Sequence, residues 1–566
     1  MARFQRQLAA VYLQALLFAA FFGALGAFAA QAFRWALEHA SELLFHSGED
    51  VTVVMGGLPV YWQIIVPVAG GALAGAILLR AQREERKSGR GDYLEVIDGS
   101  VDSIPLTSSL LRCLSSFCSI VSGGSVGKEG AMVQLSATLG SVFTRFGPGF
   151  SGERFQLAIA LAATGGLAAV YHTPLAAAVF IAEIAFGGIE FRRLALLFTA
   201  AVAATWVTIL AGQYNPQFLL PMQEFRLDAG AMLTVIGVGV ACGLTGSLLL
   251  TAINLARKGF TRVPGGPVAQ MALGGLLVGL IIVAAPEVAG NGFAPIARLL
   301  HDQPVSVALI ALLVFKIGAT ASTVGSGAVG GLFTPALLVG ALTAMQCVDL
   351  LNHALPGLNE SVILFGVVGM AATLAATTQA PLMSTLMVFE MTREPLLIFP
   401  IMLATIIAYG TASVLGQTGV YAVTGRHRER FDTRNKLMEI SVGMMMRPLE
   451  RFATEGASLE EARAQGLAEK NRFVFVLDQQ QGFVGAVSMH DLMSVTDSSE
   501  PPDGLSHFLQ REFPTVLATA RLRDVWETVV ASPAERIPVL AGADARRVVG
   551  VLHKSDVLKR ARDLLS

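Results

Sequence analysis

Residues 122–131 read SGGSVGKEGA, and residues 326–335 read SGAVGGLFTP. The two stretches share a pattern of small residues at an offset of 204. Residues 167–183 and 374–390 also agree, at an offset of 207: each begins LAA, has PL seven positions later and ends in Glu. Two matches in the same order imply duplicated halves. Duplicated apolar halves are typical of transporters, whose substrate site lies between the repeats near mid-membrane.

The composition separates a membrane body from a soluble tail. The chain has 566 residues, of which 53% are hydrophobic and 15% charged, against roughly a quarter charged in an ordinary soluble domain. Charged residues make up about one in eight before position 440 and about one in four after it. We therefore expect a transmembrane domain over 1–425, a basic linker over 426–440 and a soluble domain over 441–566. The net charge of −1 argues against a protein that binds nucleic acid by neutralising phosphates.

Long uncharged runs predict the membrane helices. Val263–Pro286, Ser361–Phe389 and Pro395–Gly425 contain no Asp, Glu, Lys or Arg, and roughly 20 apolar residues suffice to span a bilayer as a helix. Some of these runs are long enough to hold two helices joined by a turn. Leu8–Phe33 is too long for the apolar core of a signal peptide and predicts a retained first helix. The predicted fold class is therefore an all-α polytopic membrane protein with two inverted-topology repeats, about 1–220 and 221–425, followed by an α/β domain.

Basic residues give the orientation. They precede the first span, occupy residues 80–90 and follow the last span at 426–436. The positive-inside rule then places both termini in the cytoplasm. The four cysteines form no CxxC pattern and lie near no paired His, so neither a disulfide framework nor a metal site is indicated.

The duplicated turns carry the candidate chemistry. Glycine lets the chain turn sharply and leaves the first N–H groups of the next helix exposed, where the helix dipole also favours an anion. Glu129 begins one such helix, and its carboxylate is itself an anion that competes for the N–H groups. When ionised it closes the site, and when protonated it can leave. Two alternatives are that the glycines serve only helix packing and that Lys128 and Glu129 form a structural ion pair.

These residues resemble a known family. Gly127-Lys128-Glu129-Gly130-Ala131 is similar to the G-[RK]-E-G-x signature of the CLC chloride channels and transporters, and residues 331–335 match their G-x-F-x-P signature. The resemblance implies a homodimer with a separate anion pathway in each subunit, and it makes Glu129 the gating and proton-binding residue. The anion-binding residues that it implies are Gly127, Lys128, Gly130, Gly331, Leu332, Phe333, Tyr421 and Ser88, with the backbone N–H groups of Leu332 and Phe333 and the Tyr421 hydroxyl at the central anion.

Two departures from the family pattern bear on function. The G-S-G-I-P signature is not intact, and its best-spaced counterpart is Ser88-Gly89-Arg90-Gly91. Many proton-coupled members have two successive acidic residues where this chain has Glu183-Ile184, and an isoleucine cannot carry a proton. Glu183 is a second candidate proton group. Its alternative is a buried carboxylate that caps a helix or pairs structurally, which Glu390 favours because it mirrors Glu183 in the other repeat.

The tail contains its own duplication. Gly485, Ser488 and Asp491 recur as Gly550, His553 and Asp556 at an offset of 65, each time after a β-rich run. This resembles a tandem pair of CBS modules, at about 441–498 and 505–565. The resemblance makes Ser488, Asp491 and Asp556 candidates for binding an adenosine nucleotide. His553 departs from that pattern, so a purely structural pair is the alternative.

The sequence thus predicts transport of chloride or a similar monovalent anion across a bacterial cytoplasmic membrane, as Cl⁻/H⁺ antiport gated by Glu129. A passive channel of the voltage-gated type is the alternative, which Ile184 supports. A CBS-regulated divalent-cation transporter would need clustered carboxylates in the spans, and the chain has scattered ones. No nucleophile–base pair indicates an enzyme. No cofactor is expected beyond the transported chloride and a nucleotide at the CBS pair.

Overall fold

The computed structural model describes residues 2–46, 50–88, 91–99, 101–146, 150–214, 216–220, 228–301, 303, 305–355, 360–421, 440–469, 471–495, 504–542 and 546–565. The chain divides into two compact units, Met1–Thr424 and Gly425–Ser566. Of the predicted linker 426–440, residues 426–439 lie outside the described part.

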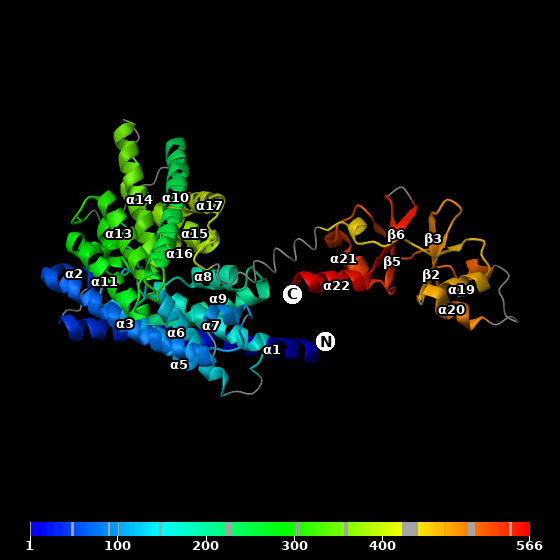
Figure 1. Ribbon diagram of the computed structural model, residues 1–566, viewed down its shortest axis with the longest axis horizontal. Coiled ribbons are helices and arrows are strands. Elements are labelled where there is room, and N and C mark those ends of the chain that lie inside the picture. The colour runs from blue at the N-terminus through cyan, green and yellow to red at the C-terminus, as the bar shows by residue number, and fades with distance from the viewer. Residues whose placement is uncertain are drawn as a thin grey trace. The chain divides into compact units, whose positions relative to one another are not determined.

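The regular elements in the described part of the first unit are all helices (Figure 1). Its first half contains α1 (Ala2–Phe45), α2 (Val51–Gly57), α3 (Val60–Ser88), α4 (Tyr93–Ile97), α5 (Leu106–Val121), α6 (Glu129–Thr144), α7 (Glu153–Tyr171), α8 (Pro174–Phe180), the π-turn η1 (Ile181–Ala185) and α9 (Phe191–Leu210). Its second half contains α10 (Ala229–Phe260), α11 (Gly266–Ala284), η2 (Pro286–Val288), α12 (Phe293–Leu300), α13 (Leu309–Gly325), α14 (Phe333–Ala354), α15 (Val362–Thr378), α16 (Pro381–Thr392), η3 (Pro395–Leu397) and α17 (Ile398–Val414).

The repeat seen in the sequence is also a repeat of backbone conformation. Helices α6 and α14 begin at the equivalent positions Glu129 and Phe333, and α8 and α16 begin at equivalent prolines. The residues that end α7 and α15, His172 and Gln379, are both left-handed, with φ of 59° and 60°. Each left-handed residue reverses the chain just before the proline that starts the next helix. The turns therefore agree in detail although the side chains differ.

The packing partners repeat as well. Helix α1 packs on α7 and α9 in the first half, and α10 packs on α15 and α17 in the second. Helices α3 and α11 pack on each other across the two halves. A Cβ at Gly71 would lie 2.3 Å from the Met271 carbonyl oxygen, and one at Gly275 would lie 2.1 Å from that of Pro67. Only glycine allows this backbone approach, and each repeat makes it toward the other.

Eight described helices are long and apolar enough to cross a membrane. They are Ala10–Phe45, Val60–Lys87, Glu153–Tyr171, Phe191–Leu210, Ala229–Phe260, Gly266–Ala284, Phe333–Ala354 and Pro395–Val414. The predicted first span falls within α1, and the uncharged run Ser361–Phe389 forms two helices, α15 and α16, joined by a turn. The prediction of an all-α polytopic membrane domain is confirmed.

The second unit contains two similar three-stranded sheets (Figure 1). The first module has β1 (Ala453–Thr454), α19 (Leu459–Glu469), β2 (Phe473–Leu477), β3 (Phe483–Ser488) and α20 (Met489–Ser494), and η5 (Gly504–Phe508) packs on it. The second has β4 (Val516–Leu517), α21 (Leu522–Ala531), β5 (Arg536–Leu540), β6 (Val548–His553) and α22 (Lys554–Leu565), and η4 (Val442–Met444) packs on it. In each sheet a parallel pair, β1–β2 or β4–β5, is followed by an antiparallel hairpin.

Candidate functional site

The two glycine-rich turns meet. Gly127 N–H donates to the Gly331 carbonyl oxygen at 2.8 Å, and Gly331 N–H donates to the Gly127 carbonyl oxygen at 2.9 Å. The two residues form an isolated antiparallel bridge. Because they occupy equivalent positions in the two repeats, each pairs with its own counterpart. The starts of α6 and α14 are thereby held together at one point inside the helical body.

The carboxylate of Glu129 lies at this junction. Its Oε1 atom accepts a hydrogen bond of 2.9 Å from Phe333 N–H, at the start of α14. The Glu129 residue is only 2% exposed. A Cβ at Gly127 would lie 2.1 Å from the carboxylate, and one at Gly331 would lie 2.3 Å from it. The paired glycines therefore provide the space that the carboxylate fills, and the dipole of α14 favours its negative charge.

Aromatic rings surround the junction. The Phe333 ring packs edge-on against Phe180 and Tyr421, with centroid separations of 5.4 and 5.6 Å. The Tyr171 hydroxyl lies 3.0 Å from Thr334 Oγ1, and Tyr171 interacts with the Glu129 carboxylate. The hydroxyl groups of Tyr171 and Thr334 therefore lie beside the carboxylate.

A large cavity of about 370 Å³ reaches the junction from one side. Gly130, Gly331, Leu332 and Tyr421 line it where it meets the glycine turns. Its charged wall residues are Glu85, Asp92, Glu95, Arg112 and Arg257. The cavity thus brings water-accessible space to the turn that precedes α14.

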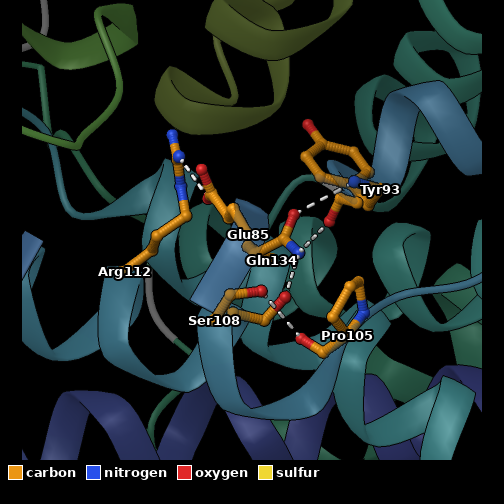
Figure 2. Close-up of polar contacts among 8 residues, drawn as sticks. Glu85, Tyr93, Pro105, Ser108, Arg112 and Gln134 are labelled. Atoms are coloured by element: carbon orange, nitrogen blue, oxygen red, sulfur yellow. Dashed lines mark hydrogen bonds and ion pairs between the residues drawn. The ribbon is translucent and has the colours of Figure 1, made fainter. Parts of the chain in front are cut away.

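A polar network forms one wall of the large cavity (Figure 2). Gln134 Oε1 accepts from Tyr93 N–H at 3.0 Å, and Gln134 Nε2 donates to the Gly91 carbonyl oxygen at 3.2 Å and to Ser109 Oγ at 3.1 Å. Arg112 Nη1 contacts Glu85 Oε1 at 2.8 Å. Since Gln134 lies in α6, the helix that begins with Glu129 also fixes the start of α4.

A second, small cavity of about 30 Å³ lies beside Glu129, which forms part of its wall. Two basic residues, Arg34 and Lys128, contribute to its wall, together with Tyr171, Asn291 and Thr334. Its volume is enough for about one or two water-sized species. Glu129 lines the small cavity, whereas its neighbour Gly130 and the paired Gly331 line the large one. The gap between the two cavities is therefore where the carboxylate lies.

The structure brings most of the sequence-predicted anion residues to this junction. Gly127, Gly130, Gly331, Leu332, Phe333 and Tyr421 form it or line the large cavity, and Lys128 lines the small one. Ser88 is the last residue of α3; its side chain, like residues 89 and 90, lies outside the described part. The cavity wall that follows is formed by Gly91, Asp92 and Tyr93. Sequence analysis missed Asp92, although an Asp directly before a short apolar helix is a recognisable N-cap.

Glu183 and Glu390 cap helices in opposite repeats. Glu183 Oε2 accepts from Met383 N–H at 2.9 Å, near the start of α16. The Glu390 carboxylate accepts from Leu175 N–H at 3.0 Å and Ala176 N–H at 2.8 Å, near the start of α8. The two arrangements are reciprocal, which matches the helix-capping alternative for Glu183.

The candidate nucleotide residues of the second unit already have partners or structural positions. Ser488 Oγ accepts from His490 N–H at 3.2 Å and caps α20, which includes Asp491. The Asp556 carboxylate accepts two hydrogen bonds of 2.6 Å from the Arg447 guanidinium, which lowers the pKa of Asp556. Burial lowers the pKa of His553, and the charges of Arg536 and Arg447 lower it further.

Comparisons with known proteins agree with this architecture. Residues 70–413 match the family model described as voltage gated chloride channel, and residues 505–563 match the CBS domain model. The chain is 39% identical over 421 residues to a putative chloride channel protein, ClcB-like, of Ralstonia nicotianae, covering 74% of this chain and 98% of the relative. It is 37% identical to the voltage-gated ClC-type chloride channel ClcB of Salmonella typhimurium, covering 72% of this chain and 97% of that protein.

Two solved structures share the fold at low sequence identity. A slow cyanobacterial Cl⁻/H⁺ antiporter aligns with a TM-score of 0.62 at 21% identity, over 74% of this chain and 99% of that one. A eukaryotic CLC transporter aligns with a TM-score of 0.58 at 18% identity, over 96% of this chain and 98% of that one. The second alignment extends over nearly the whole chain.

Proposed function

The chain belongs to the voltage-gated chloride channel (CLC) family, a family of multi-pass membrane transport proteins, and from this premise we propose that it exchanges chloride or a similar monovalent anion for protons. The proposal rests mainly on one observation, the hydrogen bond from Phe333 N–H to Glu129 Oε1. An N–H group that accommodates a carboxylate at the start of a helix also accommodates a free anion of the same charge.

Exchange follows from competition for that N–H group. While Glu129 is ionised, its carboxylate occupies the start of α14 and excludes an anion. Protonation removes the charge and about half of the hydrogen-bond strength, because a charge-assisted hydrogen bond is roughly twice as strong as a neutral one. The neutral side chain then leaves, and an anion from the large cavity takes its place. Each anion passage is thus linked to a change in the protonation of Glu129.

The direction of the two cavities follows from the basic residues. The cavity-lining residue Arg257 lies with Lys258 in the last turn of α10, and Glu85, which also lines the cavity, lies beside Arg86 and Lys87 in the last turn of α3. By the positive-inside rule, the large cavity opens to the cytoplasm and the small cavity faces the opposite side. The CBS pair, which follows the last span, is then cytoplasmic. The bacterial relatives support a location in the cytoplasmic membrane.

The protein is proposed to work as a homodimer. Leu175 and Leu382, which occupy equivalent positions beside the two reciprocally capped helix starts, are each 42% exposed. Apolar side chains of α9 and α17, such as Trp206 and Phe399, are also more than 60% exposed. Together these side chains form an apolar surface on α8, α9, α16 and α17, to which the two repeats contribute equivalent residues. Such a surface suits an isologous contact between two subunits. A particle mass of two chains in detergent supports the dimer, and a mass of one chain contradicts it.

The transport proposal is tested by ion flux in liposomes. Purified full-length protein is reconstituted with a chloride gradient and no proton gradient, and internal pH is followed together with chloride release. Exchange predicts uphill proton movement that is abolished in Glu129→Gln. Chloride release without proton movement in the wild type would instead indicate the passive channel, for which Ile184 is the supporting residue.

A further inference from the structure

A second carboxylate shares the neighbourhood of Tyr421. Tyr421 interacts electrostatically with Glu129 and with Asp92, and the neighbouring Tyr93 interacts with the same three groups. Asp92 lines the large cavity, as Tyr421 does. The path from water in that cavity to Glu129 therefore passes near two groups that exchange protons, the Asp92 carboxyl and the Tyr421 hydroxyl.

The structure holds Asp92 firmly in place. It is the N-cap of α4, and its Oδ1 atom accepts from Leu94 N–H at 3.0 Å. Gln134 hydrogen-bonds to the residues on either side of Asp92: it accepts from Tyr93 N–H and donates to the Gly91 carbonyl oxygen. Because Gln134 and Glu129 share α6, the position of Asp92 is fixed relative to Glu129.

Other charged groups face the same cavity. From α3 and α5 come Glu85 and Arg112, which neutralise each other in an ion pair of 2.8 Å. Helix α4 also contributes Glu95, and α10 contributes Arg257. Position 184, by contrast, is an isoleucine. The cavity wall thus contains an acidic residue, Asp92, whereas the residue that follows Glu183 in the π-turn η1 is apolar.

Resting on the proposed exchange, we propose that Asp92 is the group that carries protons between water in the large cavity and Glu129. A hydronium ion in the cavity transfers one proton to an Asp92 carboxylate oxygen. The protonated carboxyl passes that proton through water, past the Tyr421 hydroxyl, to the Glu129 carboxylate, and Asp92 returns to its ionised form. One proton enters and one leaves, so no co-reactant is needed, and anions and protons share the large cavity.

The alternative role is purely structural, since Asp92 also caps α4. The two roles are separated by Asp92→Asn, because Asn retains an oxygen that accepts the Leu94 N–H bond but does not titrate in this range. A structural role predicts unchanged proton coupling in this variant. Glu95→Gln is the matched control, as Glu95 is an acidic wall residue on the same helix. Asp92→Glu keeps a titratable carboxyl and serves as the rescue.

The experiment measures protons moved per chloride in liposomes that contain the full chain. We expect Asp92→Asn to reduce this ratio about tenfold or more while chloride flux continues, and to flatten the dependence of chloride flux on the pH of the large-cavity side. Glu95→Gln and Asp92→Glu are expected to stay coupled. Should Asp92→Asn fail to transport chloride at all, Asp92→Ser, which also caps a helix and does not titrate here, replaces it.

The outcomes distinguish this proposal from the exchange on which it rests. If the wild type moves protons uphill and Asp92→Asn does so at the same ratio, the role of Asp92 is refuted and exchange stands. If the wild type releases chloride without moving protons, exchange is refuted and the role of Asp92 with it. Loss of coupling in both Asp92→Asn and Glu95→Gln would also overturn the assignment, since it would show a general effect of wall charge.

Discussion

Glu129 accepts a hydrogen bond from the backbone N–H of Phe333, the residue that occupies its own position in the other repeat. One repeat therefore supplies the negative charge and the other supplies the helix start that receives it. The duplication holds in the backbone, whereas the side chains at this pair of equivalent positions differ. That inequality places a titratable gate on one side of the junction only.

Substitution of Gly331 tests the space that the carboxylate fills. In Gly331→Ala, the new Cβ would lie 2.3 Å from Glu129 Oε1, so the side chain is pushed away from Phe333 N–H. Loss of a hydrogen bond to a charged group costs about 1.5–3 kcal/mol, which shifts occupancy toward the anion by about tenfold or more. We expect chloride flux to rise and the proton-to-chloride ratio to fall in the liposome assay.

The control for this substitution is Gly410→Ala in α17, where a Cβ meets nothing within 4 Å. This variant should transport like the wild type. In a Glu129→Ala background, Gly331→Ala should add no further change, since the clashing carboxylate is absent. Wild-type coupling in Gly331→Ala would show that the carboxylate does not occupy the junction.

The caps formed by Glu183 and Glu390 predict separate effects on stability and coupling. Glu183→Leu removes the acceptor of Met383 N–H, and Glu390→Leu removes the acceptor of two N–H groups. Each is expected to lower the free energy of unfolding by about 0.5–2 kcal/mol, as for other lost caps. The measurement is the shift of the unfolding midpoint in an SDS titration.

Glu183→Gln separates capping from proton transfer. The Gln side chain keeps an acceptor for Met383 N–H, so stability should stay near that of the wild type. If Glu183 is only a cap, the proton-to-chloride ratio is unchanged as well. A stable Glu183→Gln protein that no longer moves protons would assign Glu183 a place in the proton path.

Lys316 is expected to support the wall of the small cavity. It is fully buried in α13, and its Nζ donates to the carbonyl oxygens of Val288 and Gly290 at 3.0 and 3.1 Å. Lys316→Met leaves both carbonyls without this donor, which should cost about 1–3 kcal/mol for each group. An SDS titration checks this, with the exposed Lys258→Met as the control. Equal midpoints for the two variants would contradict the assigned role.

The CBS modules should lose stability in mild acid because of His553. Its pKa is lower in the folded protein than the ordinary value of about 6.5, since burial and the nearby Arg536 and Arg447 disfavour its charged form. The unfolded chain therefore binds the proton more tightly, and stability present above about pH 6.5 is lost as the pH falls through the folded-state pKa. His553→Asn should remove this part of the pH dependence.

Hydrogen exchange of β6 and α22 in the full chain measures this effect. Compared at each pH with His553→Asn, the wild type should exchange faster at pH 5.5 and alike at pH 7.5. Asp556 serves as an internal contrast, because Arg447 lowers its pKa. Its contribution to the stability of the folded module is therefore lost only in stronger acid. Identical exchange in the two proteins at both pH values would rule out a role for His553.

The sequence predicted the junction well because its signals are local. A glycine turn, a helix start and an acidic first residue lie within ten positions, and the repeat offset indicates which other turn they meet. The capping role of Glu183 followed from the same duplication. These features depend on backbone conformation, which short patterns specify closely.

The place of Asp92 in the cavity wall and the role of Lys316 escaped sequence analysis, because the contacts that fix them join residues far apart in the chain. The start of α4 is positioned by Gln134, 41 residues beyond Tyr93, and such a contact has no short sequence signature. Lys316 donates to carbonyl oxygens 26 and 28 residues earlier. Because every residue has a backbone carbonyl, the residue types at those positions do not reveal the contact. Ser88 was predicted as the serine ligand from its spacing alone. In the described residues that follow it, the wall of the large cavity contains Asp92.

The most direct test of the account is the position of an anion relative to Phe333. Crystals of the wild type and of Glu129→Ala are grown in bromide at neutral pH, and anomalous difference maps are compared. We predict a bromide peak beside Phe333 N–H in Glu129→Ala and the Glu129 carboxylate at that place in the wild type. A Glu129→Ala map with no bromide at Phe333, or a wild-type map with bromide there and the carboxylate elsewhere, would contradict the competition between carboxylate and anion.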